Sequence, residues 1–272
     1  MLRKIPFNNK LLSLEQAGDS IYIGDSRGHI YKMDYPFYNP IKVHNVSSPI
    51  SSLLWHKNRL FYANWDGEVG FTDFNISKSI SLVRDIVKCM TIFKDHIFVS
   101  IDHIIYILDL ELKTKGRLEP PHKVLSFFPT ENKCLVGMSV PFLGEIVQNG
   151  VGDFELINIK SSKHDTAILS IHKDLTGSSD GKIMGGDDII YSSSGWINSI
   201  FSEYLFSCGR SIILKNENGF KEIYAHKDDV MKVLRIKNKI ISIGLDYTVC
   251  VWEEEMITEE ELKEIEELNK MF

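Results

Sequence analysis

Short apolar runs separated by polar turns dominate the chain, and residues 225–255 show the pattern clearly. This stretch reads AHKDDVMKVLRIKNKIISIGLDYTVCVWEEE, in which a polar turn joins VMKVLRI to KIISIGL and an Asp turn leads to TVCVWE. The runs are short and rich in β-branched residues, and the last alternates between polar and apolar positions. Helices need about ten or more residues with a period of 3.6, so the pattern predicts three strands joined by tight turns.

The same three-strand layout returns along most of the chain, in residues 10–34, 49–74 and 86–110. The second turns are marked by Asp25, Asp66, Asp102, Asp180 and Asp246, at steps of 41, 36, 78 and 66 residues. The last two steps are near twice the shorter ones, and residues 123–147 and 196–216 supply strand-like runs without the Asp. Periods of this size are typical of stacked or radial repeats, so we expect seven units in one domain.

A structural role is expected for the Asp residues and for the His residues that precede first strands. An Asp carboxylate accepts hydrogen bonds from backbone N–H groups two residues further on and so fixes a turn. His226 lies 20 residues before Asp246, and His44, His122 and His164 lie similarly just before first strands. A His that donates to a buried Asp would tie the entry of a unit to its second turn. We interpret these residues as structural partners rather than as catalytic groups.

The segment AH…DYTVCVWE at residues 225–253 resembles the Gly-His…Asp…Trp-Asp signature of a WD40 repeat, with Ala225 replacing the Gly and Glu253 the final Asp. GDSRGHIYKMD and NWDGEVGFTDF are weaker copies. The resemblance implies an all-β fold, a seven-bladed β-propeller over residues 1–255. The structural repeat motif would comprise Asp25, Asp66, Asp102, Asp180, His226, Asp246 and Trp252. In this family a strand from the other terminus usually closes the last blade, so a strand at about residues 2–7 is expected to remove the open edge.

Residues 256–272 differ from the repeats and predict a short acidic C-terminal α-helix. From residue 253 onward there are nine acidic residues and two lysines, a net charge of −7 that leaves the rest of the chain near +1. Leu262, Ile265 and Leu268 recur at a spacing of three and form a narrow apolar stripe. The helix could pack against the propeller, dock in a basic, apolar groove of another protein, or fray.

The remaining signals favour an intracellular protein, in the cytoplasm or the nucleus or both. No run of 18 apolar residues predicts a membrane span, and the first residues lack the apolar core of a signal peptide. The four cysteines lie far apart in apolar runs and are interpreted as reduced core thiols. No hydrolase, P-loop or metal-binding motif is present, so we expect no catalytic site, no cofactor and no bound metal, and no enzyme.

The family's loop arrangement, with b–c and d–a loops on one face, implies a candidate partner-binding face of Arg27, Trp65, Phe142, Arg210 and Tyr247. Trp, Tyr and Arg are the residues most enriched at interaction hot spots. The resemblance therefore implies a non-catalytic scaffold or adaptor subunit of an intracellular multiprotein complex, itself monomeric, with other proteins as partners. Two alternatives stay open, namely a WD40 factor that contacts RNA or an RNA–protein particle, and a propeller enzyme with a site in the channel. The near-neutral body gives weak support to nucleic-acid binding.

Overall fold

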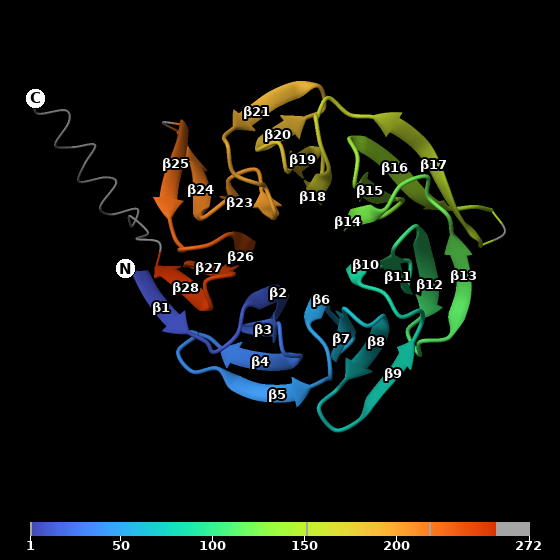
Figure 1. Ribbon diagram of the computed structural model, residues 1–272, viewed down its shortest axis with the longest axis horizontal. Helices are drawn as coiled ribbons and strands as arrows, with labels where there is room; N and C mark the ends of the chain where they lie inside the picture. The colour runs from blue at the N-terminus through green and yellow to red at the C-terminus, as the bar shows by residue number, and fades with distance from the viewer. Residues whose placement is uncertain (1, 151, 218, 254–272) are drawn as a thin grey trace, which may run out of the picture.

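The computed structural model describes residues 2–150, 152–217 and 219–253, which form seven four-stranded antiparallel sheets. Figure 1 shows these sheets as the blades of a ring around a central axis, following one another in chain order. The all-β, seven-bladed β-propeller predicted from the repeats is therefore confirmed, including blades 4 and 6, which lack the turn Asp.

Strands that are consecutive in the sequence build each blade, except the seventh. Blade 1 contains β2 (Leu11–Ala17), β3 (Ser20–Asp25), β4 (His29–Asp34) and β5 (Ile41–Asn45). Blade 2 contains β6 (Ile50–His56), β7 (Arg59–Asn64), β8 (Glu68–Thr72) and β9 (Ser77–Ser81). Blade 3 contains β10 (Val87–Phe93), β11 (His96–Ile101), β12 (Ile104–Asp109) and β13 (Thr114–Leu118). Blade 4 contains β14 (Val124–Pro129), β15 (Cys134–Met138), β16 (Phe142–Gln148) and β17 (Phe154–Ser161).

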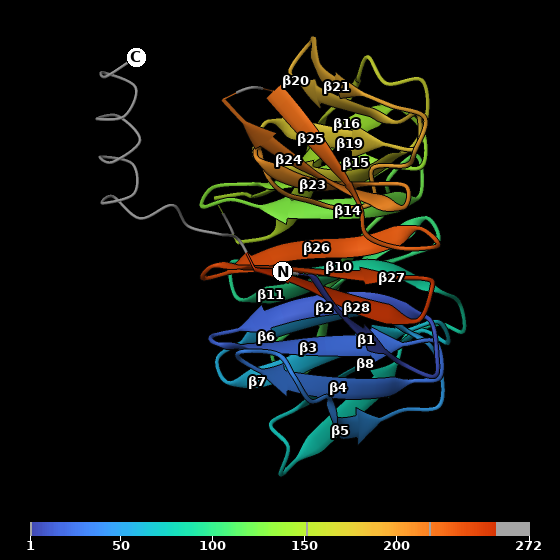
Figure 2. The same cartoon turned by 90° about the vertical axis from the view of Figure 1, so that its left-hand side faces the viewer.

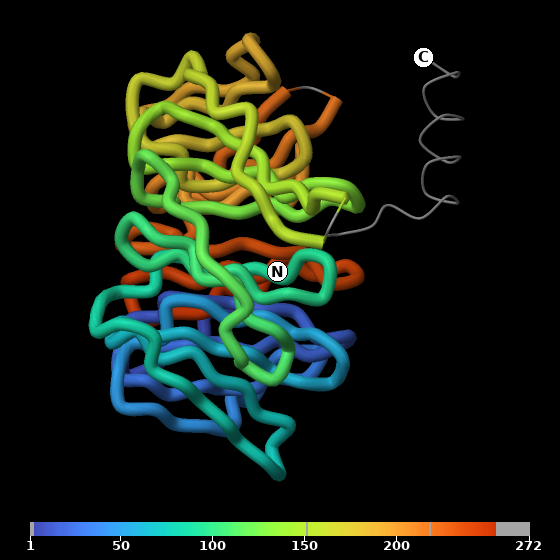
Figure 3. Tube along the Cα trace, turned by 90° about the vertical axis from the view of Figure 1, so that its right-hand side faces the viewer, coloured from blue at the N-terminus to red at the C-terminus, as the bar shows by residue number. Residues whose placement is uncertain are grey.

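The remaining blades complete the ring. Blade 5 contains β18 (Ile168–His172), β19 (Leu175–Ser178), β20 (Lys182–Gly185) and β21 (Asp188–Ser192). Blade 6 contains β22 (Ile200–Ser202), β23 (Leu205–Cys208), β24 (Ser211–Asn216) and β25 (Gly219–Tyr224). Blade 7 contains β26 (Val230–Ile236), β27 (Lys239–Gly244) and β28 (Thr248–Glu253), and its outermost strand is β1 (Leu2–Pro6). The first strand of each blade lies nearest the axis, and Figures 2 and 3 show the strands running between the two faces of the ring.

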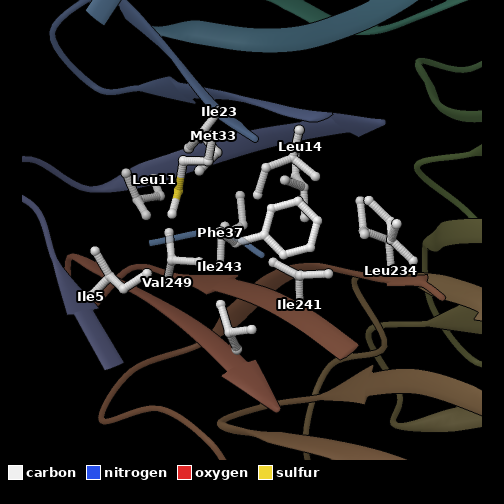
Figure 4. Close-up of a cluster of buried hydrophobic side chains, with 13 residues drawn as sticks. Ile5, Leu11, Leu14, Ile23, Met33, Phe37, Leu234, Ile241, Ile243 and Val249 are labelled. Atoms are coloured by element: carbon white, nitrogen blue, oxygen red, sulfur yellow. The ribbon is translucent and has the colours of Figure 1, made fainter. Parts of the chain in front are cut away.

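The N-terminal strand β1 closes the ring by pairing with β28. The antiparallel register runs from Leu2 opposite Trp252 to Pro6 opposite Thr248. Ile5 is buried and joins a hydrophobic cluster that β1, β27 and β28 share with β2, β3 and β4. Figure 4 shows this cluster between the first and last blades. The N-terminal strand thereby covers the edge of β28, which would otherwise stay unpaired.

Hydrophobic clusters fill the wedges between neighbouring blades. One cluster joins blades 2 and 3, another joins blades 3 and 4, and similar clusters lie between blades 1 and 2, 5 and 6, and 6 and 7. The second strands are buried on both sides, as the near-continuous burial of β3, β7, β11 and β27 shows. Their sequences are therefore apolar runs without clean alternation, because both faces of the sheet contact another blade.

Glycine turns bring two sets of loops together on one face of the ring. Gly28, Gly67 and Gly181 lie between the second and third strands of their blades with φ of 85°, 76° and 79°. Their carbonyls accept hydrogen bonds from Val46, Leu82 and Ser193, which belong to the links to the next blade. A Cβ on Gly67 would lie 1.7 Å from the Val83 carbonyl oxygen, so only glycine fits there. We call the surface formed by these turns and links the b–c face.

Side-chain hydrogen bonds also connect the inner strands of successive blades. A β-bulge interrupts the pairing of the first and second strands in all seven blades, and in blades 1, 2, 4, 5 and 6 a serine follows it. Ser13, Ser126 and Ser170 donate to the carbonyls of Ile50, Ile168 and Ile197, at distances of 3.1, 3.2 and 3.1 Å. Each accepting carbonyl belongs to the following blade, so these serines hold neighbouring blades together.

Replacement of Ser126 by Ala is expected to lower the free energy of unfolding by about 1 kcal/mol, because the Ile168 carbonyl loses a buried donor. The control is Ser81→Ala on the exposed outer strand β9, which should change stability by less than about 0.5 kcal/mol. Urea denaturation followed by fluorescence measures both. Equal stability of the two variants would contradict the role of Ser126.

The predicted helix at residues 256–272, with its stripe of Leu262, Ile265 and Leu268, lies outside the described residues. Among the residues whose placement is described, there is no helix with the length and hydrophobicity needed to span a membrane.

Candidate functional site

His226 and Asp246 form a buried hydrogen-bond network at a corner of blade 7. His226 Nδ1 lies 2.8 Å from Asp246 Oδ1, and His226 Nε2 lies 2.8 Å from the hydroxyl oxygen of Ser242. Lys227 N donates to the other carboxylate oxygen of Asp246 at 2.8 Å, and the Thr248 hydroxyl donates to Oδ1 at 2.7 Å. The network connects the entry of the blade to the turn between β27 and β28.

Burial and hydrogen bonding set the charge states in this network. Burial lowers the pKa of His226 more than the Asp246 carboxylate raises it, so the imidazole is neutral at pH 7. Burial acts to raise the pKa of Asp246, but hydrogen bonds from Lys227 N, Thr248 and His226 together hold it below its usual value. A neutral ring with its proton on Nδ1 donates to Asp246 and accepts from Ser242, which satisfies every member of the network.

Blade 5 contains a second copy of the same arrangement. His164 Nδ1 lies 3.2 Å from Asp180 Oδ2, and His164 Nε2 lies 2.9 Å from the Thr176 hydroxyl. The backbone N–H groups of Asp165 and Lys182 donate to the Asp180 carboxylate, each at 2.9 Å. Two of the seven blades thus carry a hydroxyl–His–Asp network between the same elements.

A hydroxyl, a His and a carboxylate in this order also form the catalytic triad of many hydrolases. In both blades, however, the hydroxyl is buried away from solvent. Ser242 has no exposed surface and His226 is 6% exposed, while in blade 5 Thr176 and His164 are 7% and 4% exposed. A nucleophile must reach its substrate, and these hydroxyls face the protein interior. The geometry is therefore that of a structural corner.

Asp25, Asp66 and Asp102 are placed differently from Asp180 and Asp246. The buried Asp25 carboxylate accepts from Arg27 N at 2.8 Å and from His29 N at 2.9 Å, and so fixes its turn from the end of β3. In blade 2 the corresponding acceptor is Asn64, whose side-chain oxygen accepts from Asp66 N and Glu68 N, each at 3.0 Å.

The assignment of Asp66 as the turn-fixing carboxylate is therefore wrong, because Asp66 is exposed and the buried Asn64 takes that role. Asp102 is half-buried and forms an ion pair with Lys123 at 2.6 Å in a two-residue turn. Asp25 does have a His partner, because His29 Nδ1 lies 2.9 Å from Asp25 Oδ2, but this His follows the turn instead of preceding the first strand as His226 does.

The expectation of a His–Asp pair was also wrong for His44 and His122. Among the described residues neither His bonds to an Asp, and their rings lie 5.2 Å from the Tyr62 ring and 5.5 Å from the Phe142 ring. The reason is spacing. His226 and His164 both lie four residues before their first strands, whereas His44 lies six residues before Ile50 and His122 two before Val124.

The last residue of the predicted repeat motif, Trp252, packs partly buried against the cluster between blades 6 and 7. Within the described part of the chain its indole Nε1 is buried without a hydrogen-bond partner. Trp252 therefore contributes apolar packing rather than a bond to the His226 network.

Four of the five residues predicted for the partner-binding face are exposed. Trp65 is 42% exposed, Tyr247 is 43% exposed, and Arg27 and Arg210 are exposed as well. All four belong to turns between second and third strands and so lie on the b–c face. The fifth residue, Phe142, is half-buried against His122, so it offers less surface to a partner than the prediction assumes.

Sequence reasoning missed Trp196, which is 54% exposed. Its carbonyl accepts a hydrogen bond from Gly209 N at 2.9 Å, and this bond places it beside the turn that contains Arg210 on the b–c face. The signal available in the sequence was a lone Trp in the small, polar segment SSSGWINS.

The first strands of the blades line a central channel with a volume of about 390 Å³. Its charged lining residues are Glu15, Lys88 and Lys232. Glu15 Oε1 accepts a hydrogen bond from Trp55 N at 3.0 Å, and burial raises the pKa of Glu15 to about 7. The Lys232 side chain retains accessible surface inside the channel, but desolvation by the surrounding protein lowers its pKa.

Within the described residues, no three His, Cys, Asp or Glu side chains come together as a metal site requires. All four cysteines are free thiols, and burial raises the pKa of Cys134 to about 12 and of Cys250 to about 11. Cys134 and Cys250 therefore remain protonated at neutral pH and behave as core residues.

Comparison with known proteins gives matches of structure but not of sequence. No family model and no curated protein matches the sequence. The WD40 β-propeller domain of Doa1 superposes with a TM-score of 0.78 at 12% identity, covering 93% of this chain and 96% of that one. A chain of the mitotic checkpoint complex superposes with a TM-score of 0.75 at 13% identity, covering 92% and 93%.

A third match is the computationally designed Ika8 protein, with a TM-score of 0.63 at 12% identity, covering 91% of this chain and 97% of that one. Identities this low establish the fold alone. The resemblance to WD40 repeats is thus confirmed at the level of architecture, and the chain has the seven-bladed β-propeller fold of WD40 domains.

Proposed function

We propose that this protein is a non-catalytic scaffold or adaptor that presents its b–c face to other proteins in a multiprotein complex. The observation that carries this proposal is the exposure of three aromatic residues on that face, Trp65, Trp196 and Tyr247. Large aromatic side chains with nearby arginines are the usual anchors of protein interfaces. Arg27 and Arg210 supply the arginines on the same set of turns.

The enclosure of both hydroxyl–His–Asp networks supports a role without catalysis. The hydrogen bonds of these networks fix the turns between second and third strands in blades 5 and 7, and so stabilise the shape of the b–c face. One matched structure comes from the mitotic checkpoint complex, which is a multiprotein assembly, and this agrees with a scaffold role for the same fold. The acidic segment at residues 256–272 is proposed as a second contact, on its sequence alone.

The double variant Trp65→Ala with Arg210→Ala is expected to lose partner proteins while keeping its fold. Removal of a hot-spot aromatic and an Arg from an interface typically costs several kcal/mol of binding free energy, so recovery of partners should fall about tenfold or more. The measurement is affinity purification from cells that express the tagged chain, with quantitative mass spectrometry of the recovered proteins.

The matched control removes one aromatic and one cation from the opposite face. Tyr204 is 52% exposed in the turn between β22 and β23, and Lys173 is exposed in the turn between β18 and β19. The variant Tyr204→Ala with Lys173→Ala should keep its partners. Retention of every partner by a well-folded b–c face variant would refute the assignment of this face.

A further inference from the structure

The inner strand of blade 7 breaks a pattern that other blades share. The residue that follows the bulge is Ser13 in blade 1, Ser126 in blade 4 and Ser170 in blade 5, and each donates to the next blade. Cys89 occupies the same position in blade 3 and lies 3.8 Å from the Val124 carbonyl oxygen. In blade 7 this position holds Lys232, whose side chain enters the channel instead.

A second lysine, Lys88 on β10, lines the same channel. Within the described part of the chain, neither lysine Nζ is in hydrogen-bond or ion-pair contact with another side chain or backbone group. Among the described residues that line the channel, Glu15 is the only acid. Two lysine side chains without direct partners thus face the channel, an arrangement that favours an anion from solution.

Lys232 interacts electrostatically with residues of two other blades. It acts electrostatically on Glu15 in blade 1 and on Cys89 in blade 3, although its own strand belongs to blade 7. Burial raises the pKa of Glu15 to about 7 and lowers the pKa of Lys232, so both groups shift toward their neutral forms. The channel wall still carries two lysines against one carboxyl group among the described residues.

We propose that the central channel is a binding site for a small oxyanion of the phosphate class, held between Lys88 and Lys232. The volume of about 390 Å³ accommodates a phosphate or pyrophosphate ion with some of its water. Ser52 and Thr91 line the same space and add hydroxyl donors for its oxygen atoms. Lysine binds phosphate as a point charge and needs no bidentate geometry.

Isothermal titration calorimetry with inorganic phosphate and pyrophosphate, at an ionic strength kept constant with sodium chloride, tests the proposal on the full chain. Wild-type protein is expected to bind one pyrophosphate saturably. Lys88→Met and Lys232→Ser should each weaken binding by about tenfold or more, since each removes a charged contact. Serine is the natural residue at this position in five other blades, so Lys232→Ser is expected to fold.

The control Lys42→Met removes the same charge from the exposed outer strand β5 and should bind like wild type. Sulfate extends the test to pH, because it stays divalent from pH 6 to pH 8. Sulfate binding should weaken across this range as Glu15 loses its proton, and the lowered pKa of Lys232 acts in the same direction, so Glu15→Gln should reduce the dependence. Absence of saturable binding to wild type, or full binding by a Lys88→Met and Lys232→Ser double variant, would overturn the proposal.

Discussion

Removal of residues 1–8 is expected to lower the melting temperature by roughly 10–20 °C, because the ring then loses the strand that closes it. The deletion removes the pairing of β1 with β28 and the burial of Ile5. Burial of one Ile is worth about 2 kcal/mol and each lost ladder hydrogen bond about 1 kcal/mol, which together give about 5 kcal/mol or more. In a domain of this size each kcal/mol shifts the melting temperature by roughly 2–4 °C.

Two point variants separate loss of the strand from a general effect of shortening the chain. Ile5→Asp places a carboxylate in the cluster between the first and last blades and should lower the melting temperature by several degrees. Lys4→Asp changes the exposed neighbouring residue and should have little effect. Differential scanning calorimetry measures all three proteins. An unchanged melt after the deletion would mean that β1 contributes little to closure.

The fold could be predicted because its signal repeats. Each blade places short apolar strands at similar intervals, so even blades 4 and 6, which lack a turn Asp, were found from their spacing. The repeated strands need to fit only their neighbours, and a wedge between two blades accepts many apolar residues. The propeller architecture can therefore be recognised from the strand pattern, although no family model matches the sequence.

Individual corner residues could not be assigned in the same way. A turn between strands can be fixed by the last residue of the second strand, as Asp25 and Asn64 do, or by a residue two positions later, as Asp180 and Asp246 do. In the sequence, both arrangements appear as an Asp in the turn between two apolar runs, so the position of the acceptor cannot be told apart. The distinguishing signal for the His network is a His four residues before the first strand, a spacing that His44 lacks.

The residues that line the channel could not be predicted from the sequence, for a different reason. A β-bulge shifts the register of the first strand, so simple alternation cannot tell which residues face the axis. Lys232 reads as one more polar position on β26. Only the register against β27 shows that it stands where blades 1, 4 and 5 carry a bonded serine.

Asp246→Ala is expected to destabilise the protein by about 3 kcal/mol, whereas Asp66→Ala should change stability by less than about 0.5 kcal/mol. The first variant leaves Lys227 N, the Thr248 hydroxyl and His226 Nδ1 without their shared acceptor inside the protein. Each buried donor left unpaired costs about 1 kcal/mol or more. The exposed Asp66 carboxylate stands in the corresponding turn of blade 2, where the acceptor is Asn64.

Chemical denaturation of the two variants makes a matched comparison, because both replace an Asp by Ala in a turn before the third strand. Asn64→Ala completes it, since loss of the Asn64 side-chain acceptor should cost about 1–2 kcal/mol while Asp66→Ala does not. Equal effects of Asp246→Ala and Asp66→Ala would show that turn propensity, and not the buried network, stabilises these corners. The expected large difference would show that a His, a hydroxyl and a carboxylate with the geometry of a triad stabilise the blade that β1 completes.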